Sequence, residues 1–279
     1  MDASVYDNGA GGVVLNVRPS DNEECSMTSL VQHTTHGNVH ELRLDRAPVN
    51  ALNLALCLDL ENAVRDALTQ GAQAIVLAGG PKVFSAGLDV PYLLSLGDDR
   101  NALKLAWEQF FAAARAIARS PVPVVAAIAG HAPAGGCVLA LCCDYRIMGS
   151  GPFRIGLNET RVGLVAPEGI LQLLRRVVGP HRAERLLVAG DLVESQRALE
   201  IGLVDELTDV DDVAVRARAW LEELLQLPRQ PMLETRSIAR ADLVDALDPE
   251  RIRIDHFIEG WFSGDTQAGL HALVASLRK

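Results

Sequence analysis

Residues 130–141 read Gly130-His131-Ala132-Pro133-Ala134-Gly135-Gly136-Cys137-Val138-Leu139-Ala140-Leu141. The apolar second half of this stretch predicts a short helix, and small residues crowd the start of that helix. The first N–H groups of a helix have no partner within it, and the positive end of the helix dipole lies beside them. Because no bulky side chain stands in the way, an oxygen atom can approach these N–H groups closely. The stretch therefore predicts a pocket of donors for a negatively charged oxygen.

A second stretch, Ile155-Gly156-Leu157-Asn158-Glu159-Thr160, places one carboxylate among apolar neighbours. If Leu157, Val162 and Leu164 pack around Glu159, burial raises the pKa of that carboxyl group. A glutamate tuned in this way is suited to general acid–base catalysis. We interpret the two stretches as one site, a donor pocket beside a single base. Taken alone, a glutamate such as Glu159 is more often a solvated loop residue.

Working outward, apolar runs alternate with helical patterns over about two hundred residues. Short strands are predicted at residues 39–44, 73–78, 124–129, 145–148 and 203–207. Repeated strand and helix units are typical of an α/β core. After residue 211 the pattern is helical throughout, and a dense aromatic stripe contains Phe257, Trp261 and Phe262. This stripe packs either on the chain's own core or on another subunit.

These patterns divide the chain into three parts. Residues 1–26 show no periodicity and are rich in Gly, Asn and Asp, which predicts a mobile tail. Residues 27–228 form the predicted α/β core. Residues 229–279 form a helical C-terminal region.

The composition predicts a globular protein with an acidic surface. Of the 279 residues, 49% are hydrophobic and 22% are charged, and the formal net charge is -10. The acidic balance argues against nucleic acid and anionic membrane surfaces as partners, because both require a basic footprint. No charge-free apolar run is long enough to cross a bilayer, so no membrane span is expected.

The cysteines indicate a reducing compartment. Four of the five lie in apolar runs and no Cys-x-x-Cys spacing occurs, which favours free thiols and gives no zinc-ligand pattern. The first residues lack the basic start and apolar centre of a secretory signal, and their acidic residues disfavour a mitochondrial transit peptide. We therefore expect a cytoplasmic protein that requires no metal.

Several common catalytic motifs are absent from the sequence, among them the P-loop, the dinucleotide-binding GxGxxG, HExxH and GxSxG. The remaining patterns each have a purely structural explanation. The Ser85-Ala86-Gly87 turn fits a tight strand-to-helix connection, and Asp89 fits an acidic residue at a helix start. Asp144 and Arg146 fit a structural pair at a helix-to-strand junction.

Three motifs in order along the chain carry a resemblance to a known family. They are Val83-Phe84-Ser85-Ala86-Gly87-Leu88-Asp89, Pro133-Ala134-Gly135-Gly136-Cys137 and Cys143-Asp144-Tyr145-Arg146-Ile147. Together they resemble the crotonase superfamily, also called the enoyl-CoA hydratase/isomerase family, and the resemblance extends from about residue 39 to the C-terminus. It implies an α/β fold built as a crotonase-like spiral of ββα units. It also implies that the helical C-terminal region makes trimer contacts, in a homotrimer or a dimer of trimers.

The same resemblance implies an acyl-CoA ligand, with CoA as part of the substrate and no separate cofactor. The thioester oxygen is then expected between two backbone N–H groups, an oxyanion hole that maps onto Ala86 and Gly135. Further residues of the matching segments are expected to line the substrate site: Phe84, Gly87, Leu88, Asp89, Gly136 and Asn158.

Two positions decide which reaction the resemblance implies. Hydratases of the family carry two glutamates, and the corresponding positions here are Val138, which cannot transfer a proton, and Glu159. Hydration needs both a base and an acid, whereas moving a double bond needs one group that takes a proton and returns it. The segments 155–160 and 235–240 resemble mitochondrial-type Δ3,Δ2-enoyl-CoA isomerases. Glu168 is a departure, because it supplies a second acid if its side chain enters the site.

We therefore predict an isomerase that converts 3-enoyl-CoA into 2-enoyl-CoA in fatty-acid β-oxidation, with Glu159 as the catalytic residue. An enoyl-CoA hydratase, or another acyl-CoA reaction such as thioester hydrolysis, is the nearer alternative. The other alternative is a crotonase-fold protein that binds acyl-CoA without turnover.

Overall fold

The computed structural model describes residues 5–7, 13–15 and 29–277. The predicted mobile tail at residues 1–26 therefore lies largely outside the described residues. Within it, β1 (Val5–Asp7) and β2 (Val13–Leu15) pair as antiparallel strands.

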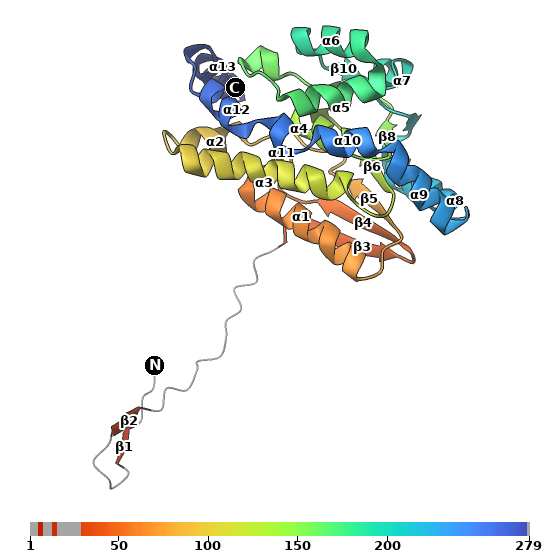
Figure 1. Ribbon diagram of the computed structural model, residues 1–279, viewed down its shortest axis with the longest axis horizontal. Helices are drawn as coiled ribbons and strands as arrows, with labels where there is room; N and C mark the ends of the chain where they lie inside the picture. Colours follow the sequence, from red (N-terminus) through yellow and green to blue (C-terminus); the bar gives the residue numbers. More distant parts are fainter. Residues whose placement is uncertain (1–4, 8–12, 16–28, 278–279) are drawn as a thin grey trace.

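A six-stranded sheet forms the centre of the fold (Figure 1). Its strands are β3 (Val31–His36), β4 (Val39–Leu44), β5 (Ala74–Ala78), β6 (Val124–Ile128), β8 (Tyr145–Gly149) and β11 (Glu206–Thr208), in the order β11-β8-β6-β5-β4-β3. β3 and β4 are antiparallel, and all other neighbours in this sheet are parallel. β5 and β6 are buried along their whole length, which explains their unbroken apolar sequences.

The predicted strands are confirmed except at the two edges of the sheet. The strand predicted at 203–207 lies at 206–208 instead. β3 was not predicted because its sequence, Val-Gln-His-Thr-Thr-His, is mostly polar. Its place at the edge of the sheet exposes much of it to water, so the chain can form a strand there without an apolar pattern.

Helices cover both faces of the sheet and divide the core in two. α1 (Leu54–Thr69) and α3 (Arg100–Ala118) lie side by side over one face (Figure 1), where the larger core includes Leu42, Leu77 and Phe110. On the other face, α8 (Val213–Leu224) packs on β5, β6 and β8. It contributes Ala217 and Leu221 to a smaller core.

A second, three-stranded sheet carries the chain into the candidate site. Its strands are β7 (Ala132–Pro133), β9 (Arg154–Gly156) and β10 (Val193–Glu194), in the order β10-β9-β7. β7 leads directly into the helix α4 (Gly135–Leu141), and β9 leads into the 3-10 turn η1 (Glu159–Val162). Because β7 and β9 are paired, the two stretches predicted to form one site start from neighbouring strands.

The remaining elements surround this frame. They are α2 (Val90–Ser95), α5 (Glu168–Val178), α6 (Pro180–Ala189), α7 (Ser195–Glu200), η2 (Val210–Asp212), α9 (Arg229–Ala239), α10 (Ala241–Ala246), α11 (Pro249–Ile252), α12 (Ile254–Trp261) and α13 (Gly264–Leu277). Among the described helices, none combines the length and the apolar character that a membrane crossing requires.

The last four helices, α10 to α13, pack on the rest of the same chain. α10 and α11 contact α5, α12 contacts α3, and α13 contacts η1 and α2. The Trp107 ring of α3 lies 4.3 Å from the Phe257 ring and 6.3 Å from the Trp261 ring, measured between centroids. Of the two interpretations of the aromatic stripe, the structure therefore supports packing on the chain's own core for Phe257 and Trp261.

Candidate active site

The start of α4 leaves one backbone donor without an acceptor among the described residues, in an unusual local geometry. Ala134, which precedes the helix, has φ 47° and ψ -119°, and its N–H donates to Gly156 O over 2.8 Å. The next amide, that of Gly135, has no acceptor among the described residues. A Cβ atom on Gly135 would lie 3.0 Å from Leu52 Cδ1, so only glycine fits here without displacing a neighbour. The predicted free N–H at the helix start is therefore present at Gly135.

The turn at residues 84–89 packs directly against this helix start. A Cβ atom on Gly136 would lie 2.4 Å from Ser85 O, and one on Gly87 would lie 3.1 Å from the backbone nitrogen of Gly135. Gly87 also has φ +83°, a conformation that other residues rarely adopt. The two glycine-rich stretches, distant in sequence, thus form one surface.

The amide of Ala86 is not a free donor. It donates to Val49 O over 3.0 Å, so this hydrogen bond already uses the N–H that we predicted for the oxyanion hole. The prediction for Ala86 is therefore wrong in this structure. The reason is the segment around Val49, which runs beside the turn and supplies an acceptor that the turn sequence alone does not reveal.

The free donor in this turn is Leu88. Leu52 pairs with the turn on both sides of Leu88, because its N–H donates to Gly87 O over 2.8 Å and its O accepts from Asp89 N over 3.0 Å. In an extended segment successive backbone groups point to opposite sides, so the N–H of Leu88 points away from Leu52. Within the described part of the chain it has no acceptor.

Side-chain hydrogen bonds and an ion pair stabilise the turn at residues 84–89. Asn50 Nδ2 donates to Phe84 O over 3.1 Å, and Ser85 Oγ donates to Asn50 O over 2.8 Å. Phe84 is fully buried in the core. Asp89 pairs with Arg46 over 2.7 Å and accepts a hydrogen bond from the first turn of α2. Phe84 and Asp89, expected to line the substrate site, thus have partners that support the turn.

Asn50 is a site residue that the sequence argument missed. Its φ of +50° and its buried side chain mark it as a structural centre of this turn. Asparagine tolerates the left-handed conformation better than most residues, because its short amide forms local hydrogen bonds. The signal available in the sequence is an asparagine shortly after Pro48.

Glu159 is the buried titratable group of the site. Its Oε2 is buried and has no hydrogen-bond partner among the described residues. Burial raises the pKa of Glu159 from its usual 4.5 to about 7, and a hydrogen bond from its own backbone amide opposes this shift. In Cys137, on α4, the pKa of the thiol is raised by burial and then by the Glu159 carboxylate, which places that carboxylate near α4. Asn158 Oδ1 is also buried and has no hydrogen-bond partner in the part of the chain that the structure describes.

The two other positions that bear on the reaction carry no acid into the site. Val138 lies on α4 and is completely buried in the core. Glu168, the possible second acid, has a side chain that is 51% exposed and lies 3.5 Å from Arg251. It therefore faces the surface, as expected for a carboxylate in the first turn of α5.

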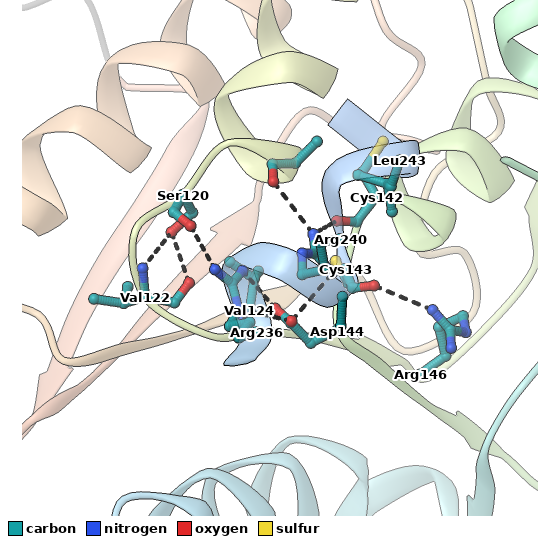
Figure 2. A network of polar contacts seen from close by, with 12 residues as sticks. Ser120, Val122, Val124, Cys142, Cys143, Asp144, Arg146, Arg236, Arg240 and Leu243 are labelled. Atoms are coloured by element: carbon teal, nitrogen blue, oxygen red, sulfur yellow. Dashed lines mark hydrogen bonds and ion pairs between the residues drawn. The ribbon is translucent and has the colours of Figure 1, made fainter. Parts of the chain in front are cut away.

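The far end of α4 is held by a partly buried ionic cluster (Figure 2). Asp144 accepts from Arg236 Nε and Nη2 over 2.7 and 2.8 Å, and it lies 3.1 Å from Arg240 Nη1. Arg240 Nη2 also donates to Cys142 O, at the end of α4, over 2.7 Å. The predicted pair of Asp144 with Arg146 is wrong, because Arg146 pairs with Asp205 over 2.6 Å.

The chain was compared with known proteins. A sequence-family model described as Enoyl-CoA hydratase/isomerase matches residues 34–274. Mitochondrial enoyl-CoA delta isomerase 1 of Mus musculus is 33% identical over 258 residues, which are 90% of this chain and 87% of that protein. A protein of Mycobacterium tuberculosis named as a probable enoyl-CoA hydratase is 31% identical over 228 residues, which are 80% of this chain and 85% of that protein.

A solved structure gives the same answer for the fold. Human mitochondrial Δ3,Δ2-enoyl-CoA isomerase superposes with a TM-score of 0.84 at 27% identity, covering 89% of this chain and 98% of that one. The predicted α/β crotonase fold is therefore confirmed. Since the family model covers most of the chain, the protein is an acyl-CoA enzyme of the enoyl-CoA hydratase/isomerase family, also called the crotonase superfamily.

Proposed function

We propose that the protein is a Δ3,Δ2-enoyl-CoA isomerase in which Glu159 alone moves the proton. The observation that carries this proposal is one buried carboxyl group at the site, with Val138 where a hydratase has its second acid and Glu168 directed to the surface. The similarity to mammalian isomerases over most of the chain supports it. The reaction belongs to the class that prepares unsaturated acyl groups for fatty-acid β-oxidation.

The proposed reaction needs one base and no net change in protons. The Glu159 carboxylate removes a proton from C2 of a 3-enoyl-CoA, and the electron pair of that C–H bond spreads through the double bond and onto the thioester oxygen. The resulting dienolate takes the same proton back from Glu159 at C4. The double bond then lies between C2 and C3. A carboxyl group with a pKa of about 7 can both take and return a proton near neutral pH.

The dienolate oxygen requires donors, and we assign this role to the N–H groups of Gly135 and Leu88. Both lack an acceptor within the described residues, and they lie on the two stretches that pack together at the start of α4. Donors positioned for the charge that develops in the transition state are worth about 10²–10³ in rate each. Gly87, Gly136 and Asn158 remain proposed parts of the substrate site.

The test is a pair of assays with purified protein, one with 3-enoyl-CoA and one with 2-enoyl-CoA and water. We expect isomerisation to exceed hydration, and we expect Glu159→Gln to lower the isomerisation rate by at least about 10³. The variant keeps the shape of the side chain and removes its ability to take up and return a proton. Isomerisation that persists at the wild-type rate in Glu159→Gln would contradict the mechanism.

Enoyl-CoA hydration is the second candidate, because a relative of similar identity is named as a probable hydratase. Hydration faster than isomerisation in the same assays would favour it.

A cytoplasmic location also remains a proposal, and the mammalian relatives carry the word mitochondrial in their names.

A further inference from the structure

The Glu159 carboxylate is not held by any other side chain of the described structure. Its Oε2 has no hydrogen-bond partner, and the hydrogen bond that bears on its pKa comes from its own backbone amide. The position of the carboxylate therefore depends on the position of the backbone in η1. Whatever holds η1 also sets where the proton is taken and returned.

On one side, η1 is held by the α6 region. Thr160 Oγ1 donates to Leu187 O over 3.2 Å, and Arg161 Nε donates to Gly190 O over 2.8 Å. Arg161 also pairs with Asp191 over 2.7 Å. These contacts hold the first half of the turn and leave its last residues to another element.

On the other side, η1 is held by the start of α13. Thr266 is buried, and its Oγ1 donates to Gly163 O over 2.5 Å while accepting from Ser263 Oγ over 2.9 Å. Gly163 closes η1 with φ +76°, and the next amide, that of Leu164, donates back to Glu159 O over 2.9 Å. Gly163 O and Leu164 N belong to the same peptide unit. The hydrogen bond from Thr266 to Gly163 O therefore restrains the amide that donates to Glu159 O.

The same helix approaches η1 so closely that glycine is required. A Cβ atom on Gly269 would lie 2.5 Å from Val162 O, and one on Gly163 would lie 2.8 Å from Asp265 O. These are backbone oxygens, and Val162 O cannot move aside without moving the turn, nor Asp265 O without moving the helix. The fit between α13 and η1 is thus a direct backbone contact as well as a hydrogen bond.

We propose that Thr266 is a positioning residue of the reaction, which sets the place of the Glu159 carboxylate by holding Gly163 at the end of η1. The inference rests on the proposed function for its kinetic consequence. Thr266 does not touch the reacting atoms in this account. Thr266 acts through the backbone of η1. The close contact of Gly269 with Val162 O also holds η1 in place.

Two matched pairs of variants test the proposal. Thr266→Val keeps the size of the side chain and removes the hydroxyl group, whereas Thr266→Ser keeps the hydroxyl group. Gly269→Ala places a methyl group against Val162 O, whereas Gly264→Ala, on the same helix, places one in open space. Isomerisation kinetics, the pH profile of kcat and thermal unfolding are measured for all four.

We expect Thr266→Val and Gly269→Ala to lower kcat by about 10- to 100-fold with KM within about twofold, since a small misplacement of a catalytic group is costly. Thr266→Ser and Gly264→Ala are expected to keep kcat within about twofold. The pKa seen in the pH profile is expected to fall in the two impaired variants, because a displaced η1 admits water to the carboxylate. A kcat or a pKa in Thr266→Val equal to that of wild type would overturn the proposal, as would a loss of kcat in Thr266→Ser as large as in Thr266→Val.

A titration without substrate separates this inference from the proposed function. The carboxyl carbon of Glu159 is followed by NMR in protein labelled at glutamate, and its signal is assigned by its loss in Glu159→Gln. A lower pKa of Glu159 in folded Thr266→Val supports the positioning role whatever reaction the enzyme catalyses. A wild type that does not isomerise 3-enoyl-CoA contradicts the proposed function alone, and an unchanged pKa in Thr266→Val contradicts the positioning role alone.

Discussion

At the scale of single residues, the property that defines the site is the burial of Glu159. Its Oε2 is buried and has no hydrogen-bond partner among the described residues. Such a group favours its neutral form, and the folded protein binds its proton more tightly than the unfolded chain does. The same burial that prepares Glu159 for proton transfer therefore makes its ionisation costly for stability.

This burial predicts a pH-dependent gain in stability for Glu159→Gln. In wild type the contribution of Glu159 to the free energy of unfolding falls as the pH rises from about 4.5, its pKa in the unfolded chain, to about 7, its pKa in the folded protein, and then levels off. Glutamine does not titrate. The free energy of unfolding of the variant minus that of wild type is therefore expected to grow by up to about 3 kcal/mol between pH 4 and pH 8. Urea unfolding at several pH values measures this difference. A difference in the free energy of unfolding that does not change with pH would contradict this prediction.

The residue scale also shows where sequence reasoning ends. Apolar residues such as Leu157 and Leu164 stand close to Glu159 in the chain, so the burial of its carboxyl oxygen could be anticipated. The choice between Ala86 and Leu88 as donor could not, because it depends on acceptors at Val49 and Leu52, which only the folded chain brings alongside. Which amide of a turn is free is a property of its neighbours in space.

At the scale of elements, α4 is held at both ends by segments distant in sequence. The turn at 84–89 packs against its start, and Arg240 donates to the carbonyl at its end. Arg236 and Arg240 are one helical turn apart, so both reach Asp144 (Figure 2). In the segment 235–240, which resembles the corresponding segment of isomerases, Arg236 and Arg240 thus both bind Asp144.

Removing Asp144 is expected to be much more costly than removing an exposed acid. Asp144→Ala leaves the buried Arg240 guanidinium without its carboxylate, and we expect a loss of about 3–5 kcal/mol in the free energy of unfolding. Glu200→Ala breaks an exposed pair with Arg197 and is expected to cost less than about 1 kcal/mol. Denaturant unfolding of both variants measures the contrast. Similar losses in the two variants would show that the cluster does not hold the C-terminal helices.

Among the strands, those that are long and buried on both faces were the easiest to predict from the sequence. Strands with both faces covered, such as β5 and β6, are apolar throughout and were predicted within one or two residues. The two- and three-residue strands β7, β9 and β10 are too short to show any period, so the second sheet was not predicted. Pairing between distant segments forms them, and a single sequence does not display that pairing.

At the scale of the whole molecule, the C-terminal helices divide into packed and unpacked parts. α12 is fastened to α3 by Trp107 on Phe257, by the Lys104–Asp255 pair at 2.6 Å and by Arg100, whose guanidinium lies 4.3 Å from the centre of the Phe262 ring. α9, in contrast, has no buried residue in the single chain, and its Ile238 is 79% exposed. Figure 1 shows α8 and α9 at the margin of the molecule.

We propose that the protein assembles as a homotrimer or a dimer of trimers, with α9 close to the contact between subunits. The unpacked α9 is the feature of the described chain that favours this. We expect sedimentation equilibrium or light scattering to give three or six times the chain mass of 30.0 kDa. A mass that stays at that of one chain over the micromolar range would refute the assembly.

The three tryptophans of the chain give the molecule a built-in optical reporter. Trp107 and Trp261 lie with their ring centroids 6.3 Å apart across the contact of α3 with α12, and Trp220 of α8 stacks on Tyr145 at 4.4 Å. Every indole thus lies where a late helix meets the earlier part of the chain. Because an indole emits at longer wavelength once water reaches it, intrinsic fluorescence follows the docking of these helices directly. Detachment of the C-terminal region should therefore be visible as a red shift without any added dye.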